Sequence, residues 1–192
     1  VGGLIVAYNP GLVATTVADI SKVTHGTDVA IAGAAMVALA VASGVAGRSW
    51  DEAADDVLAI FDIAKTYGEP TWAASVKRRF ELALDAACNI HDPEKYSRWI
   101  YEVLGTGTMT SESVSAALAV AWFCRDAKKA AIMCANMGGD TDTIGAMSVA
   151  ICGAMKRIES IPADWLQTLE QHQNHNSLEL PQQIILTRPA VK

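Results

Sequence analysis

Apolar side chains recur every three or four residues along most of this chain, which is the spacing that places them on one face of an α-helix. One run comprises Trp50, Ala54, Val57, Leu58, Phe61 and Ala64, and a second comprises Val76, Phe80, Ala83, Leu84 and Ala87. No succession of segments has the alternating pattern of β-strands. The pattern therefore predicts helices throughout the chain.

Prolines, glycines and short polar side chains indicate where these helices begin and end. Pro10 is expected to begin a helix that runs to about Lys22, because proline is favoured in the first turn. Ser49 is expected to cap a helix whose first turn carries Asp51 and Glu52. Further helices are expected behind a cap at Asp28, from Ser111 to Cys124, from Asp126 to about Asn136, from about Thr141 to Arg157, and from Pro162 to Gln171.

This succession of helices with short connections predicts a compact multi-helix, all-α bundle, formed by a single domain over residues 1–192. The composition agrees, because 51% of the residues are hydrophobic and 19% are charged. The net charge is −6 and no block of lysines and arginines is present. Binding to nucleic acid or to an anionic membrane surface is therefore not expected.

One apolar segment is long enough to raise the question of a membrane span. Val29–Gly47 has no charged residue over 19 positions. It consists mostly of alanine, glycine and valine, and such small side chains allow neighbouring helices to approach closely. We therefore expect a buried central helix at this position.

The cysteines form no Cys-x-x-Cys pair, and most of them lie in apolar helical stretches. They are Cys88, Cys124, Cys134 and Cys152. This arrangement predicts reduced, buried thiols in a cytoplasmic protein rather than a zinc site.

The segment with the clearest candidate chemistry runs from Asn136 to Gly145 and reads NMGGDTDTIG. Its glycines permit a tight turn, after which Asp140, Asp142 and Thr143 place three oxygen-bearing side chains at the start of a helix. Hard oxygen ligands of this kind suit Mg²⁺, Mn²⁺ or Ca²⁺. From the spacing alone, the alternative is that one of the aspartates simply caps the helix.

The motif Gly-Gly-Asp-Thr-Asp-Thr-Ile-Gly, followed by a helix of small residues, resembles the C-terminal signature of the ADP-ribosylglycohydrolase family. Other segments resemble that family in the same order, namely Thr24–His25, Gly105–Thr108 followed by Glu112, and Ile161–Trp165. The resemblance covers nearly the whole chain. It implies an all-α, divalent-metal-dependent hydrolase that cleaves the N- or O-glycosidic bond between ADP-ribose and an acceptor.

The resemblance also implies roles for individual residues of the motif. Asp140, Asp142 and Thr143 correspond to ligands of a two-metal site that holds Mg²⁺ or Mn²⁺, and Asp142 would bridge both ions. Asp140 and Asp142 would thereby be the catalytic residues. Two adjacent cations can orient the ribose hydroxyls and position a water at the anomeric carbon.

By the same resemblance, the ADP-ribose cleft would be lined by His25 and by the loop residues Gly105, Thr106 and Gly107. From the residues alone, His25 could equally be a histidine near a helix start whose ring is bonded to the backbone. Glu112 is expected to support the start of its helix rather than to take part in chemistry.

One part of the family pattern is missing from this sequence. Family members normally carry an N-terminal segment with a Gly-Asp motif, a water-activating acidic residue and a Thr/Ser-Asp-Asp metal motif. Asp55–Asp56 does not replace it, because this pair lies within a helix and is expected to form a solvated face. The sequence is therefore interpreted as N-terminally truncated, with an incomplete metal shell.

Removing part of an all-α core exposes apolar helix faces, which water penalises at about 25 cal/mol per Å². The chain is therefore expected to form a homo-oligomer or to associate with the missing N-terminal segment. Two other functions stay open at this point. One is a catalytically inactive fragment or scaffold protein, as in the eye-lens crystallins that resemble this family. The other is hydrolysis of a simpler, nucleoside-like ribosyl compound.

Overall fold

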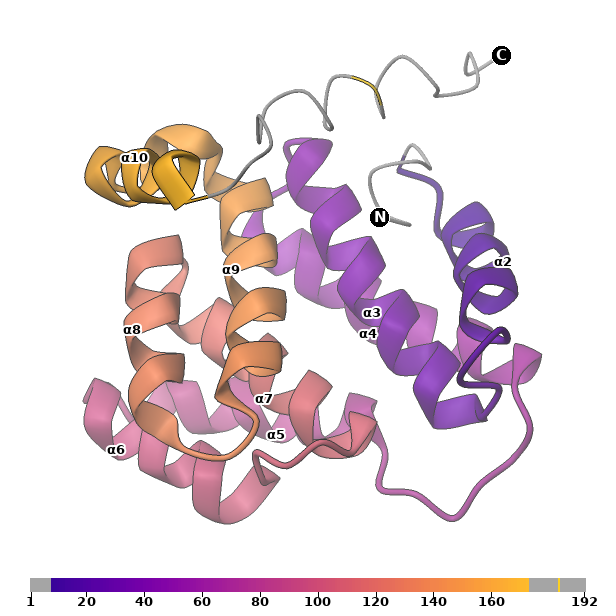
Figure 1. Cartoon of the computed structure of the whole chain (residues 1–192). Helices are drawn as coiled ribbons and strands as arrows, with labels where there is room; N and C mark the ends of the chain where they lie inside the picture. Colours follow the sequence, from indigo (N-terminus) through magenta and orange to yellow (C-terminus); the bar gives the residue numbers. More distant parts are fainter. Residues whose placement is uncertain (1–7, 173–182, 184–192) are drawn as a thin grey trace.

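A computed structural model describes residues 8–172 and residue 183 (Figure 1). Within these residues the chain forms helices and no sheet, which confirms the predicted all-α class. The α-helices are α2 (Pro10–Ser21), α3 (Asp28–Val45), α4 (Trp50–Ala64), α5 (Val76–Asn89), α6 (Pro93–Trp99), α7 (Thr110–Cys124), α8 (Ala127–Met137), α9 (Thr141–Lys156) and α10 (Ala163–His172). Short helical turns follow α4, α6 and α9 at Lys65–Tyr67, Ile100–Leu104 and Ile158–Ser160.

Side-chain caps explain why the helix starts could be located from the sequence. Ser49 and Glu52 form the reciprocal capping box that begins α4, as predicted. The expected cap at Asp28 is wrong by one residue, because the Thr27 hydroxyl accepts the Ala30 N–H and α3 begins at Asp28. The Asp28 carboxylate instead accepts hydrogen bonds from the Val29 N–H and the Thr71 hydroxyl.

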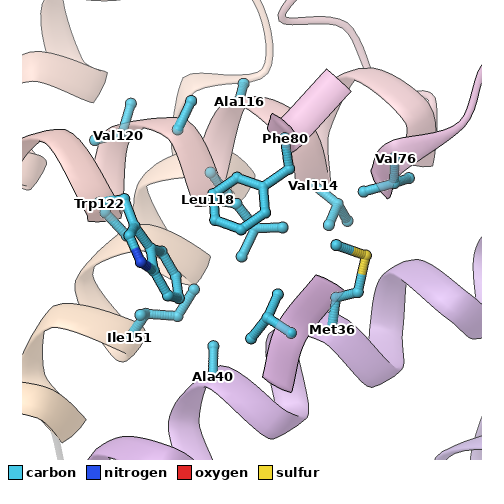
Figure 2. Close-up of a cluster of buried hydrophobic side chains, with 14 of the residues drawn as sticks. Met36, Ala40, Val76, Phe80, Val114, Ala116, Leu118, Val120, Trp122 and Ile151 are labelled. Atoms are coloured by element: carbon cyan, nitrogen blue, oxygen red, sulfur yellow. The ribbon is translucent and has the colours of Figure 1, made fainter. Parts of the chain in front are cut away.

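Helices α3, α7 and α9 form the centre of the bundle, and α2, α4, α5 and α8 pack around them. Figure 2 shows the middle of this core, where Met36 of α3, Phe80 of α5, Trp122 of α7 and Ile151 of α9 belong to one cluster and Ile151 lies beside Trp122. Trp122 meets the ring of Phe80 edge-on, with 5.0 Å between the ring centroids. The core therefore joins segments that are far apart in the sequence.

The apolar segment at Val29–Gly47 forms α3. This is the one helix in the described residues that is long and apolar enough to cross a membrane, and 61% of its 18-residue window is buried inside the fold. Its small residues allow close packing: Gly33 lies against Thr110 of α7, and Gly44 lies against the backbone of α9 at Ala154. The helix thus occupies the central position that the sequence predicts.

Two expectations about polar groups need correction. Cys88 is exposed rather than buried, whereas Cys134 and Cys152 are buried, and burial raises the pKa of the Cys152 thiol to about 12. Asp56 is not part of a solvated face. Its carboxylate pairs with the Arg48 Nε at 2.7 Å and accepts a hydrogen bond from the Tyr8 hydroxyl, so it ties the start of the described chain to α4.

The contact between α3 and α9 gives a first testable prediction. A methyl group at Gly44 would lie 2.7 Å from the backbone of Ala154 and Met155, and backbone atoms cannot rotate aside. We expect Gly44→Ala to destabilise the protein by about 1–3 kcal/mol in urea unfolding followed by circular dichroism. The matched control is Gly153→Ala on α9, which has open space around the added methyl group and should stabilise the helix by about 0.5–1 kcal/mol. Equal stability of the two variants would contradict the close packing of α3 on α9.

Candidate functional site

The predicted motif forms the turn between α8 and α9. Gly138 and Gly139 both adopt positive φ angles, 84° and 80°, which side-chain-bearing residues rarely do. The chain thereby reverses direction over two residues, and α9 begins immediately after Asp140. The turn lies at the lower end of the bundle in Figure 1. The glycine pair is therefore required by the backbone of this turn.

Asp140 does not cap α9 through its side chain. Its carboxylate accepts no backbone N–H of the helix, and its Oδ1 instead accepts a hydrogen bond of 2.9 Å from the Thr143 hydroxyl. Asp142 is exposed in the first turn of the same helix. The simple capping alternative thus fails for Asp140, and oxygen atoms of Asp140 and Thr143 lie together at the N-terminus of α9.

The second predicted loop, Gly105–Thr108, packs directly on this turn. The Asp140 N–H donates to the Thr106 carbonyl at 2.7 Å. A methyl group at Gly139 would overlap the carbonyl and hydroxyl oxygens of Thr106, so only glycine allows this approach. Thr106 itself is only 4% exposed. The structure therefore brings together two motifs that are separated in the sequence by α7 and α8.

Two charged residues hold the second loop in place. The Glu112 carboxylate accepts the Gly107 N–H at 2.8 Å, and methyl groups at Gly105 or Gly107 would approach it to 2.7 Å. These two glycines are therefore explained by Glu112, which supports the loop before α7 as well as the start of that helix. Arg79 of α5 donates to two backbone carbonyls flanking the loop, those of Leu104 and Ser111, each at 2.8 Å.

The sequence interpretation missed Arg79. An isolated arginine in an amphipathic helix has no local signature, because its role depends on the packing of α5 against α7. Only weak evidence for the role of Glu112 is present in the sequence, namely its position in the first turn of a predicted helix.

His25 lies on the exposed connection between α2 and α3, where its Nδ1 is 2.9 Å from the Thr24 hydroxyl. No hydrogen bond joins it to Asp140, Asp142 or Thr143 in the part of the chain that the structure describes. The C-terminal parts of α3 and α9 meet at Gly44, and Figure 1 shows that both N-termini point to the same end of the bundle. His25 and the motif therefore share one end of the molecule without touching.

The donor set suits a hard divalent cation, because Asp140, Asp142 and Thr143 offer two carboxylates and a hydroxyl within one helical turn. The set is small. Among the described residues, no group of three or more histidine, cysteine, aspartate or glutamate side chains is arranged to hold a metal ion. Three oxygen donors leave several positions of a six-coordinate cation to water or to other groups.

Comparison with known proteins identifies the family to which this helical bundle belongs. The chain belongs to the ADP-ribosylglycohydrolase family, whose profile matches residues 1–190. It is 41% identical over 146 residues to the uncharacterized protein YegU of Escherichia coli. The aligned region covers 76% of this chain and 44% of YegU. It is 28% identical over 203 residues to the ADP-ribosylhydrolase ARH3 of Mus musculus, covering 88% of this chain and 51% of the relative. An uncharacterized protein of Archaeoglobus fulgidus is 27% identical over 173 residues.

The chain spans about half the length of the curated relatives that it matches. The resemblance drawn from the Gly-Gly-Asp-Thr-Asp motif is thus confirmed at the level of the family. The metal ligands and the substrate contacts remain predictions for individual residues.

The contact between the two loops gives a second testable prediction. We expect Gly139→Ala to destabilise the protein by about 2–4 kcal/mol, because a strained φ angle adds to the overlap with Thr106. Hydrogen exchange at the Asp140 amide should accelerate, since its bond to Thr106 is lost. Gly138→Ala is the matched control: its φ angle is also positive, but the added methyl group would meet only Tyr101 at an ordinary 3.5 Å. The loop contact is refuted if the Asp140 amide stays equally protected in both variants.

Proposed function

We propose that this chain carries one half of a glycohydrolase site that cleaves the glycosidic bond between ADP-ribose and an acceptor. The observation that carries the proposal is the packing of the Gly138–Asp140 turn on the Gly105–Thr106 loop through the 2.7 Å bond between Asp140 and Thr106. Family membership supplies the reaction class. Because the relatives are about twice as long, the proposed activity is that of the complete site.

We further propose that Asp140, Asp142 and Thr143 hold Mg²⁺ or Mn²⁺. When bound, such cations orient ribose hydroxyls, polarise a water and favour the charge that develops in the transition state. The residues of this chain would hold these oxygen donors in position. The Thr143 hydroxyl fixes the orientation of the Asp140 carboxylate, and the N-terminal end of α9 favours the negative charge of Asp142.

The proposed substrate contacts differ in how they would act. His25 is exposed, and its imidazole can hydrogen-bond a ribose hydroxyl. Gly105 and Gly107 are partly exposed and can offer backbone groups. Thr106 is buried beneath Gly139, so its contribution would be to position the turn that carries Asp140.

The third testable prediction concerns ligand binding. In calorimetric titration with Mg²⁺ present, ADP-ribose should bind saturably to the full chain, and Asp140→Ala with Asp142→Ala should weaken binding by at least roughly tenfold, because two carboxylates that would hold the cation are removed. The matched control is Asp19→Ala with Asp85→Ala, which removes two exposed carboxylates elsewhere on the surface and should leave binding unchanged.

The outcomes separate the candidate functions. If both double variants weakened ADP-ribose binding equally, binding would depend only on the net charge of the protein. That outcome would reject the proposed site. A folded chain that binds no ADP-ribose would mean either the scaffold alternative or a fragment whose function requires the missing N-terminal segment. Binding of simple ribosides with the same affinity as ADP-ribose would favour the nucleoside-like substrate.

A further inference from the structure

Helix α10 is amphipathic, but its apolar face is not packed against the core. Trp165, Leu166 and Leu169 share one side of the helix, none of its residues is buried, and Leu169 is 50% exposed. Among the described residues, Ile161 is the last that packs against the core. Figure 1 shows α10 at the edge of the bundle beyond the end of α9. The structure therefore contains a short helix whose apolar side is only partly covered within the described chain, because Trp165 and Leu166 are half-buried and Leu169 is exposed.

A groove elsewhere on the molecule has the size and the apolar lining needed to bind a helix such as α10. It has a volume of about 1590 Å³ and lies between α6 and α8, over the C-terminal ends of α5 and α7. Its lining includes Phe123, Met133 and Met137, as well as Ile132, which is 49% exposed. Methionine side chains adapt to irregular apolar surfaces. A ten-residue helix is about 15 Å long and 10 Å wide, roughly 1200 Å³, so the groove is large enough for one.

The charges of the two surfaces are complementary. Lys95 and Lys129 line the groove, are exposed and take part in no ion pair among the described residues. Asp164 and Glu170 on α10 are likewise exposed and without an ion pair in the described part. Glu94 also lines the groove without an ion pair in the described part, whereas the other charged lining residues form the pairs Arg98–Glu102 and Arg125–Asp51. The unpaired lysines therefore outnumber the unpaired carboxylate two to one. In a chain with a net charge of −6, this positive excess beside an apolar groove favours an acidic partner, and α10 is an acidic amphipathic helix.

We propose that α10 of one copy of this chain docks into the groove between α6 and α8 of a second copy. Two copies that exchange their α10 helices in this way form a closed dimer with two-fold symmetry, in which both grooves and both apolar helix faces are covered. The proposal does not use the candidate metal ligands, although the groove borders their motif at Asn136 and Met137. It specifies the two surfaces, α10 and the groove, through which the expected self-association would occur.

The fourth testable prediction is a charge-swap experiment on the full chain, followed by sedimentation equilibrium. Wild-type protein should dimerise. Lys95→Glu with Lys129→Glu, and separately Asp164→Lys with Glu170→Lys, should each raise the dimer dissociation constant by at least roughly fivefold, because attractions between exposed charges become repulsions. An equimolar mixture of the two variants should regain dimers, since both exchanged contacts of the mixed dimer again pair opposite charges.

The matched control is Lys22→Glu with Lys128→Glu, which makes the same charge change at exposed lysines outside the groove and should not alter the dissociation constant. All of the substituted side chains are exposed, so circular dichroism should report unchanged folding. As a second measurement, a labelled peptide of residues 161–172 should bind wild-type protein saturably and bind the Lys95→Glu, Lys129→Glu variant more weakly. A wild-type chain that stays monomeric at all concentrations, a dimer indifferent to both charge reversals, or a mixture that fails to regain dimers would overturn the proposal.

Discussion

The hydrogen bond from the Asp140 N–H to the Thr106 carbonyl joins the two loops on which the candidate site is built. The bond requires glycine at position 139, because any side chain there would occupy the space of Thr106. It also requires the second loop to be rigid, which Arg79 and Glu112 achieve by binding backbone groups at its edges. A carboxylate at the start of a helix is common, and in this chain the residue that carries it is also held from behind by a second, separately anchored loop.

The central helices set the geometry of this end of the bundle. Helix α3 is built from small residues, and glycine at position 44 brings its C-terminal part into contact with the backbone of α9. The same helix contacts the start of α7 at Gly33, where a larger side chain would meet Thr110. Helix α3 therefore contacts both the start of α7 and the C-terminal part of α9, and small displacements within the core would be transmitted to both helices.

The sequence predicted the features that depend on local chemistry. Proline, serine and aspartate at helix starts gave the boundaries of α2, α4 and α8 to within a residue or two, and the glycine pair before Asp140 located the break between α8 and α9. The features that were missed depend on residues distant in the chain. The burial of Thr106 follows from its contact with Gly139, and the role of Arg79 follows from the packing of α5 on α7. The single-residue error at Asp28 arose because threonine and aspartate are adjacent and both are good caps.

The turn before α9 gives a physical reason to favour a binding site over a purely structural protein. A side-chain cap would stabilise the helix by about 0.5–2 kcal/mol, yet the Asp140 carboxylate makes none. The turn also uses two glycines with positive φ and places a second carboxylate, Asp142, within the same helical turn, where like charges repel. A helix N-terminus by itself attracts anions. Two carboxylates and a hydroxyl at that point are instead the kind of donor set that would suit a divalent cation, as proposed above. The turn therefore lacks the stabilisation that a side-chain cap would give, and such departures from local stability are expected at functional sites.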